Sequence, residues 1–176
     1  MMIQPLVQLS DDQLKSRSIF DCGSPTLNSY LLQTAGQHEK RNVARTFCGL
    51  QNETIIAYYS LANTEVDVGA VRPEVVKRYR MPMHRLPAVR LCRLAVSTLY
   101  HRRGIGGQLL VDAMLRVVAV SNASGCVGLV VDALNSEAAR YYEGFGFRPA
   151  PNLPLVLFMP LPEIEALLST ENRRRS

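Results

Sequence analysis

The chain has 176 residues, 47% hydrophobic and 20% charged, a composition that supports one folded core and excludes a disordered polar chain. Its net charge of +5 is concentrated between Val71 and Arg103, where nine basic residues face one acidic residue, so this segment carries +8 and the remainder −3. Such a concentration of positive charge favours the binding of a polyanion. The alternative is a solvated basic face in which two or three arginines bind the phosphates of a cofactor.

The first predicted helix follows a turn near residue 22. Ser24 suits the N-cap, and Pro25 suits the first helical position because its missing N–H costs nothing there. Apolar residues then recur at helical spacing to about Lys40. Two strands, Phe47–Leu50 and Ile55–Ala62, flank a short polar turn and predict an antiparallel hairpin.

The rest of the chain predicts alternating strands and helices. Glu65–Val68 continues or follows the hairpin, and Pro73–Tyr79 forms a short helix before a loop rich in proline. After the loop the expected elements are strand Val89–Val96, turn His101–Gly107, a helix from Gly106 to about Val120, strand Val127–Ala133, helix Ser136–Glu143 with Asn135 or Ser136 as cap, strand Leu155–Met159 and helix Glu163–Leu168. This order predicts an α/β (α+β) fold around a mixed sheet, with one domain over residues 1–170 and a disordered basic tail over residues 171–176.

Targeting and metal-binding signals are not evident. Residues 1–10 lack a signal-peptide pattern, and the apolar stretch Val127–Leu134 is too short to cross a bilayer, so we expect a cytoplasmic protein without a membrane partner. The four cysteines are single and widely spaced, which predicts reduced, mostly buried thiols and no metal site. A cysteine nucleophile is the less favoured alternative, since no His or Asp stands in a recognisable relation to one.

The strongest local motif is the glycine-rich turn His101–Gly107 between a strand and an amphipathic helix. Glycines let the backbone approach an anion closely, and successive N–H groups at a helix start favour negative charge. Arg102 and Arg103 can add phosphate contacts. A Walker loop is excluded because Gly-Lys-Ser/Thr is missing, and a dinucleotide fingerprint is excluded because Leu109 replaces its third glycine. The remaining alternative is a plain helix entry.

Three segments together resemble the GNAT superfamily of N-acetyltransferases. They are Arg93-Leu94-Ala95-Val96, the glycine turn, and the run from Asn135 to Phe147 with Tyr142 and Phe145-Gly146-Phe147. The family patterns are Gln/Arg-x-x-Gly-x-Gly/Ala and Asn-x-x-Ala-x-x-Phe/Tyr-Tyr-x-x-Phe-Gly-Phe. One departure is His101, which stands where Gln or Arg is usual.

The resemblance implies acetyl-CoA as cosubstrate and a set of site residues. A strand that splays from its neighbour would hold the pantetheine arm, the turn would bind the pyrophosphate, and Asn135 and Ala138 would line the arm from the other side. Tyr142 would be the general acid for the leaving thiolate, with the Val96 N–H polarising the carbonyl; Glu143 and His84 are weaker candidates for a base. The implied cofactor-binding residues are Leu94, Ala95, Val96, Arg102, Arg103, Gly104, Ile105, Gly106, Gly107, Asn135 and Ala138.

Further motifs resemble the GNAT toxins of bacterial type II toxin–antitoxin modules, the TacT-like proteins. They are Phe20-Asp21-Cys22-Gly23, Leu27-Asn28-x-Tyr30-Leu31 and Tyr58-Tyr59-Ser60-Leu61. This resemblance implies acetylation of aminoacyl-tRNA, which blocks translation, together with a homodimer and a ribbon-helix-helix antitoxin. The phosphates of tRNA would be bound by Arg78, Arg80, Arg85, Arg90 and Arg93, although Arg93 could instead buttress its strand.

Two other functions remain open from the sequence. One is an acetyltransferase for a protein N-terminus or a small amine, and the basic segment argues against a cationic small substrate. The other is a protein without catalytic activity, either a CoA-binding regulator or a DNA-bound partner subunit.

Overall fold

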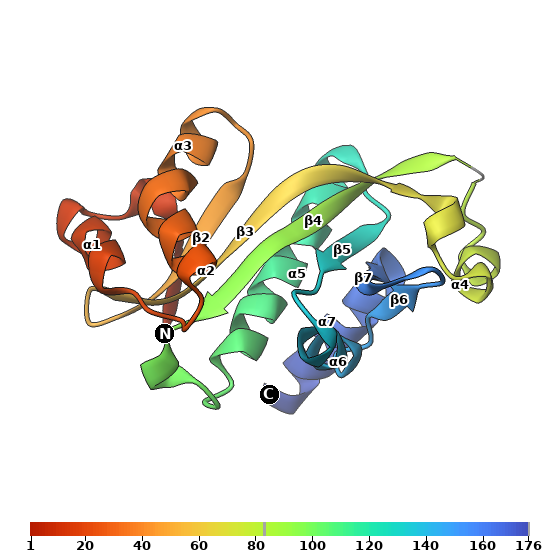
Figure 1. Cartoon of the computed structure of the whole chain (residues 1–176). Helices are drawn as coiled ribbons and strands as arrows, with labels where there is room; N and C mark the ends of the chain where they lie inside the picture. Colours follow the sequence, from red (N-terminus) through yellow and green to blue (C-terminus); the bar gives the residue numbers. More distant parts are fainter. Residues whose placement is uncertain (83, 176) are drawn as a thin grey trace. The chain divides into compact units, whose positions relative to one another are not determined.

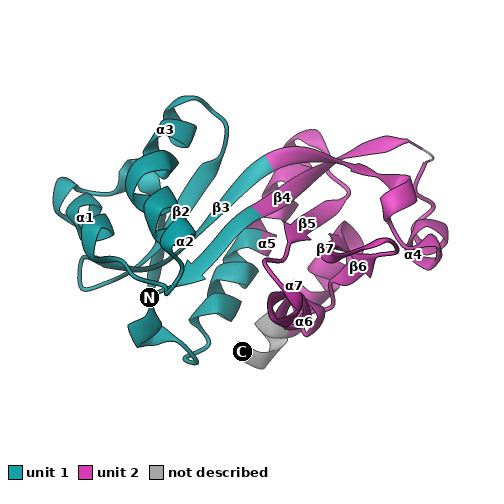
Figure 2. Ribbon diagram, viewed as in Figure 1, with its two compact units in different colours: residues 1–62, 92–113 teal, residues 63–91, 114–176 magenta. Residues whose placement is uncertain are grey.

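The structure is a computed structural model that describes residues 1–82 and 84–175, with side chains described as far as residue 170. Among these residues, seven strands form one mixed sheet in the order β1-β2-β3-β4-β5-β7-β6 (Figure 1). The chain divides into two compact units, residues 1–62 with 92–113 and residues 63–91 with 114–176 (Figure 2). Strands β3 (Thr54–Asp67) and β4 (Arg85–Val96) run through both units. This arrangement confirms the predicted fold class.

In the first unit, helical segments cover one face of antiparallel strands. β1 (Met2–Pro5) pairs with β2 (Arg45–Gln51), which pairs with β3. The covering segments are the 3-10 turns Leu6–Gln8 and Ser16–Ile19, α1 (Asp11–Lys15), α2 (Pro25–Ser29), the π turn η3 (Tyr30–Thr34) and α3 (Ala35–Lys40). The predicted helix to Lys40 is thus confirmed, with a π turn inserted.

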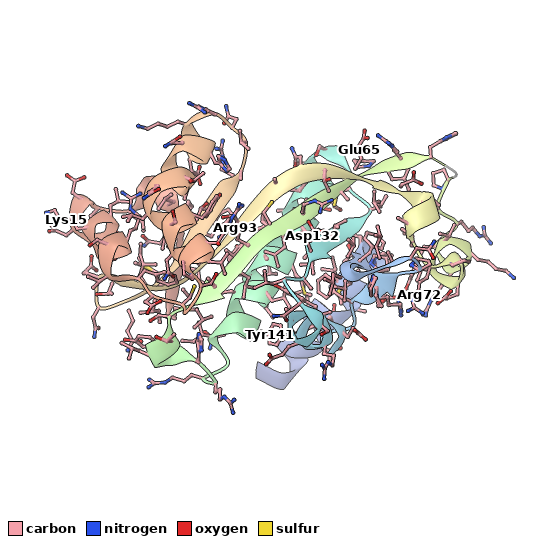
Figure 3. All side chains as sticks on the ribbon, in the orientation of Figure 1. Lys15, Glu65, Arg72, Arg93, Asp132 and Tyr141 are labelled. Carbon is pink, nitrogen blue, oxygen red and sulfur yellow. The ribbon has the colours of Figure 1, made fainter. Side chains whose placement is uncertain are left out.

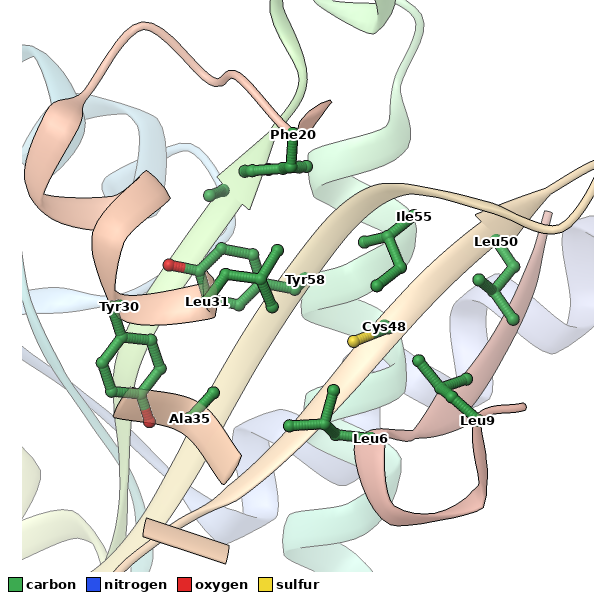
Figure 4. Close-up of a cluster of buried hydrophobic side chains, with 11 residues drawn as sticks. Leu6, Leu9, Phe20, Tyr30, Leu31, Ala35, Cys48, Leu50, Ile55 and Tyr58 are labelled. Carbon is green, nitrogen blue, oxygen red and sulfur yellow. The ribbon is translucent and has the colours of Figure 1, made fainter. Parts of the chain in front are cut away.

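Strand alternation distributes the side chains of β3 between two cores. Tyr58 is fully buried among Phe20, Tyr30 and Leu31 of the helical segments (Figure 4). Its neighbour Tyr59 is also fully buried but donates a hydrogen bond to Asp112 of α5 (Ile105–Ser124). Successive residues of a strand point to opposite faces, so the two tyrosines anchor the helical segments and α5 to opposite faces of the sheet.

Helix α5 is a core helix. Its Leu109, Leu110 and Met114 have no exposed surface, as expected for an amphipathic helix packed on a sheet. By length and composition alone it is also the one helix among the described residues that could cross a membrane, a test that core helices commonly pass.

The second unit contains the remaining strands and helices. β4 runs parallel to β5 (Gly128–Asp132) over Val89–Leu91, β5 is antiparallel to β7 (Leu153–Pro160), and β7 is antiparallel to β6. The other elements are η4 (Val68–Ala70), α4 (Pro73–Arg78), α6 (Ser136–Glu143), β6 (Arg148–Ala150) and α7 (Leu161–Arg175).

One boundary of the second unit differs from the sequence prediction, because β4 begins at Arg85, inside the segment predicted as a loop. β3 continues to Asp67, which is one of the two alternatives predicted for Glu65–Val68. At these strand ends, Val66 of β3 and Ala88 of β4 pack into a separate apolar cluster with Val75 of α4, Val130 and Phe158. The basic tail over residues 171–176 stays a prediction, since side chains are described only to residue 170 and Ser176 lies outside the described residues.

Candidate active site

The strand part of the candidate site is the end of β4. The ladder between β4 and β5 stops at the pair Leu91–Val131, and β4 continues to Val96. Leu94 and Val96 are half-buried, whereas Ala95 is buried in the core cluster of the first unit. The main chain of Leu94–Val96 therefore extends past the last residue that β5 pairs, as the predicted splay requires.

His101 connects this strand to the glycine-rich turn. Its Nε2 lies 2.7 Å from the carbonyl oxygen of Val96, and because a carbonyl only accepts, the ring nitrogen donates. A glutamine or arginine side chain at the same position could donate to the same oxygen. The departure from the family pattern at His101 thus keeps a donor that holds the turn against the strand.

The turn presents several main-chain N–H groups in succession. Arg102 and Gly104 have φ angles of +59° and +73°, and α5 begins at the next residue, Ile105. The first main-chain hydrogen bond into the helix runs from Gln108 N to Gly104 O, so the N–H groups of residues 105–107 precede the intrahelical bonds. Left-handed residues before a helix start form an anion-binding concavity. Apart from Gly104 and its two chain neighbours, no described heavy atom lies within 4 Å of a Cβ built at Gly104, so its space is open.

Both arginines of the turn are exposed. The guanidinium of Arg103 lies 5.2 Å from the ring centre of Tyr100, which limits its motion. Among the described residues, neither Arg102 nor Arg103 has an ion-pair partner. Their charges are therefore available to an anion at the turn.

The second unit holds the other residues predicted for catalysis and cofactor binding, on α6 and at its N-cap. Asn135 is the N-cap, and its side-chain oxygen accepts a hydrogen bond of 2.9 Å from Ala138 N. This confirms Asn135 rather than Ser136 as the cap. Tyr142 lies in the last turn of the same helix, with 8% of its surface exposed. One short helix and its cap thus carry the three residues of this unit that were predicted for catalysis and cofactor binding.

Tyr142 is packed by aromatic rings but keeps its hydroxyl at the surface. Tyr141 and Phe147 contact its ring edge-on, at centroid distances of 5.5 and 5.8 Å. The Tyr142 hydroxyl has no hydrogen-bond partner among the described residues. Every fully buried side-chain oxygen or nitrogen of these residues does have a partner. The Tyr142 oxygen is therefore not fully buried and reaches solvent. Burial of the ring raises the Tyr142 pKa to about 12. The phenol is therefore protonated at neutral pH and can donate.

The five basic residues predicted to bind RNA differ in their surroundings. Arg78 and Arg80 are exposed, at the end of α4 and in the turn after it. Arg85 lies 3.9 Å from Glu65, and Arg90 forms an ion pair with Asp132. These four belong to the second unit, whereas Arg93, which is labelled in Figure 3, belongs to the first. The guanidinium carbon of Arg93 lies 3.7 Å from the ring centre of Tyr30.

The cysteines are not suited to act as nucleophiles. All four cysteines are free thiols, of which Cys48 and Cys126 are buried and the other two half-buried. Burial raises the pKa of Cys22 and Cys126, and that of Cys48 to about 12, so these thiols are poor nucleophiles. No group of three or more metal-ligating side chains occurs in the described part of the chain.

A polar loop before α2 supports the turn and was not assigned a role from the sequence. The main-chain carbonyl of Asp21 accepts a hydrogen bond of 2.9 Å from Thr98 N, in the segment that joins β4 to the turn. Asn28 fixes this loop by accepting from Cys22 N and donating to the Asp21 carboxylate. Two hydrogen bonds to the carboxylate, first that from Gly23 N and then that from the Asn28 side chain, lower the Asp21 pKa. In the sequence, the pattern Asp21-Cys22-Gly23 was the signal that could have identified this loop.

The fold and the two groups of residues define an acetyltransferase of the GNAT class. The family model of the acetyltransferase (GNAT) domain matches residues 43–149. The chain belongs to this family, as its motifs indicated, and is an acyltransferase.

Relatives of the chain include GNAT toxins. It is 33% identical over 149 residues to the tRNA-acetylating toxin of Mycobacterium tuberculosis, a match that covers 85% of this chain and 88% of that protein. AtaT complexed with acetyl-methionyl-tRNAfMet has a TM-score of 0.83 and 29% identity, covering 94% and 98% of the two chains. A tyrosine-to-phenylalanine mutant of AtaT, bound to acetyl-CoA and the C-terminus of the antitoxin AtaR, has a TM-score of 0.77 and 28% identity, covering 96% and 97%.

Proposed function

We propose that the chain is a toxin that transfers an acetyl group from acetyl-CoA to the α-amino group of aminoacyl-tRNA and thereby blocks translation. The observation that carries this proposal is the similarity, over nearly the whole chain, to a toxin complexed with acetylated methionyl-tRNA. The basic residues between Val71 and Arg103 supply the charge that a tRNA acceptor needs.

The turn before α5 fits the diphosphate of coenzyme A. An anion at the turn would accept hydrogen bonds from the N–H groups of residues 103–107 and from the two arginines. The positive end of the helix dipole would also attract it. Gly104 leaves open space where a side chain would stand. We assign the pyrophosphate to Arg102, Arg103, Gly104, Ile105, Gly106 and Gly107, and the pantetheine arm to Leu94, Ala95, Val96, Asn135 and Ala138.

Acetyl-CoA supplies an acetyl group activated as a thioester. The Val96 N–H would donate to the carbonyl oxygen as negative charge develops on it. Tyr142 holds a proton on a solvent-reaching hydroxyl and would donate it to the departing sulfur. The acceptor α-amine has a pKa of roughly 7.7–8.0, so a useful fraction is neutral near pH 7 and a strong base is unnecessary.

The partners follow from the same similarity. We propose a cytoplasmic protein that is neutralised by a ribbon-helix-helix antitoxin and forms a homodimer. The structure of an AtaT mutant bound to the C-terminus of the antitoxin AtaR supports the proposal that this chain has an antitoxin partner. Mass measurement of the isolated protein, and of the protein coexpressed with the product of a neighbouring gene, tests both assemblies.

The decisive experiment measures transfer of labelled acetyl from acetyl-CoA to charged tRNA, with uncharged tRNA as the control acceptor. We expect transfer only to the charged form. Tyr142→Phe should bind coenzyme A as the wild type does by calorimetry but lose about 100-fold or more in turnover. Absence of transfer to every aminoacyl-tRNA would remove the proposed acceptor, and unchanged turnover of Tyr142→Phe would remove the proposed acid.

A further inference from the structure

Arg93 lies on an aromatic platform in the first unit. Its guanidinium carbon is 3.7 Å from the ring centre of Tyr30, a stacking distance. Tyr30 stacks in turn with Tyr58 at 6.1 Å and 19°, and Tyr58 contacts Phe20 edge-on at 5.6 Å. Tyr30 and Tyr58 are 4% and 0% exposed, so the platform beneath the guanidinium is rigid (Figure 4).

The ring that lies under Arg93 belongs to the first residue of a helical irregularity. Ala35 N donates to Tyr30 O, which makes Tyr30–Thr34 a π turn between α2 and α3. The wider turn lets the consecutive residues Tyr30 and Leu31 both face the core. Single π turns inside α-helices occur frequently at functional sites, because they re-aim a side chain.

The hydrogen-bonding edge of Arg93 remains open. Arg93 has neither an ion pair nor a hydrogen bond with any residue in the described part of the chain. No buried side-chain nitrogen in that part lacks a partner, so the Arg93 nitrogens reach solvent. In contrast, Arg90 on the same strand is paired with Asp132. The planar guanidinium of Arg93 is thus held on one face by the Tyr30 ring, while the N–H donors along its edge bind no described residue.

Such a fork suits an oxyanion that accepts two parallel hydrogen bonds. Arginine binds phosphate and carboxylate in this bidentate manner, and stacking on a ring reduces the entropy lost on binding. Arg93 also directly precedes the strand segment Leu94–Val96, to which we assign the pantetheine arm, and the Val96 N–H would contact the carbonyl of the reacting thioester. The bound oxyanion should therefore belong to the acceptor, close to its reactive amine.

We propose that Arg93, positioned by Tyr30, binds the phosphodiester of the acceptor RNA that is nearest to the reactive amine. This inference rests on the proposed function. Strand geometry puts the Cα atoms of Arg93 and Val96 about 10 Å apart. In an aminoacyl ester of a 3′-terminal nucleotide, roughly eight bonds join the amine nitrogen to the nearest phosphorus, a span of up to about 10 Å. One phosphate on Arg93 would hold the amine within reach of Val96.

The test compares two acceptors that carry the same amino acid. One is charged tRNA, and the other is the 3′-aminoacyl ester of adenosine, which has no phosphate. Arg93→Ala should lower kcat/KM about 10- to 100-fold for charged tRNA. The same variant should leave the value for the adenosine ester within about twofold, because the interaction removed requires the phosphate. Arg93→Lys keeps the charge but not the fork, and should lose part of the activity toward tRNA only.

Two further variants serve as controls. Lys15→Ala removes the same charge from an exposed ion pair with Asp12 and should not change transfer to either acceptor. Tyr30→Leu removes the platform and should add little to the loss of Arg93→Ala in the double variant, since both act through one contact. Coenzyme A affinity, measured by calorimetry, shows that each variant is folded.

The outcomes separate this inference from the proposed function. If Arg93→Ala loses activity equally with both acceptors, or with neither, the phosphate subsite is refuted while tRNA acetylation stands. If the wild type binds coenzyme A but acetylates neither acceptor, the proposed function fails and the subsite fails with it.

Discussion

At the scale of single residues, the protonation of Tyr142 decides which pH range supports turnover. Its aromatic surroundings disfavour the phenolate, and this burial raises the pKa from the ordinary value of 10 to about 12. An acid that must donate a proton is active only below its own pKa. Burial of the ring thus extends the range in which Tyr142 can act beyond that of a free tyrosine.

The pH dependence of single-turnover transfer tests this role. With rising pH the rate should increase to a plateau above about pH 8, as the acceptor amine loses its proton. It should then stay flat to about pH 10, because Tyr142 remains protonated there. A descending limb centred near pH 9, measured with a hydrolysis-corrected charged tRNA, would contradict the assignment of Tyr142 as the acid.

His101 is a second residue whose role can be measured. His101→Ala removes the donor to the Val96 carbonyl, and because the ring is exposed we expect a loss of about fivefold or less in coenzyme A affinity. His101→Gln should restore most of that affinity, since an amide can donate to the same oxygen. Titration calorimetry of the two variants gives the comparison; equal affinities for His101→Ala and the wild type would show that the contact does not order the turn.

At the scale of elements, α6 is a short helix that depends on its cap. The side chain of Asn135 satisfies Ala138 N, one of the four N–H groups without an intrahelical partner. Because α6 also carries Tyr142 in its last turn, the cap positions the proposed acid.

Asn135 variants separate capping from cofactor binding. Asn135→Ala should lower the free energy of unfolding by about 1 kcal/mol, measured by urea denaturation, and Asn135→Ser should recover it. If Asn135 also lines the pantetheine arm, Asn135→Ser will still bind coenzyme A more weakly than the wild type. Wild-type affinity in the serine variant would limit Asn135 to capping.

The elements also show what the sequence could predict. Local rules predict the long helix after Gly104, which has a periodic apolar pattern. They also predict the short helix α6, which is marked by its cap Asn135. The strand β1, the short turns before residue 20 and the three-residue β6 carry too few residues for a periodic pattern, and their pairing partners are distant in sequence. The glycine-rich turn predicts an anion site, but no pattern indicated that Tyr30 would lie beneath Arg93, since the two residues are far apart in the sequence and Tyr30 begins a π turn.

At the scale of the whole molecule, charge is distributed unevenly over a chain with a modest net charge. The segment 71–103 carries +8 and the remainder −3, so its field differs strongly from that of the whole chain. Acidic residues moderate part of this field, as Glu65 does near Arg85 and Asp132 does for Arg90. Arg78 and Arg80 are exposed and supply charge at the end of α4.

The salt dependence of tRNA binding counts the phosphate contacts of the molecule. If Arg78, Arg80, Arg85, Arg90 and Arg93 bind phosphates, the slope of log affinity against log salt should be about −3 to −5, and each arginine-to-alanine change should reduce its magnitude by about one. Asp132→Asn removes the carboxylate that faces Arg90 and should instead strengthen binding at low salt. A flat salt response in wild type and variants alike would mean that the basic segment is only a solvated face, and the acceptor would then have to be recognised through its amino acid.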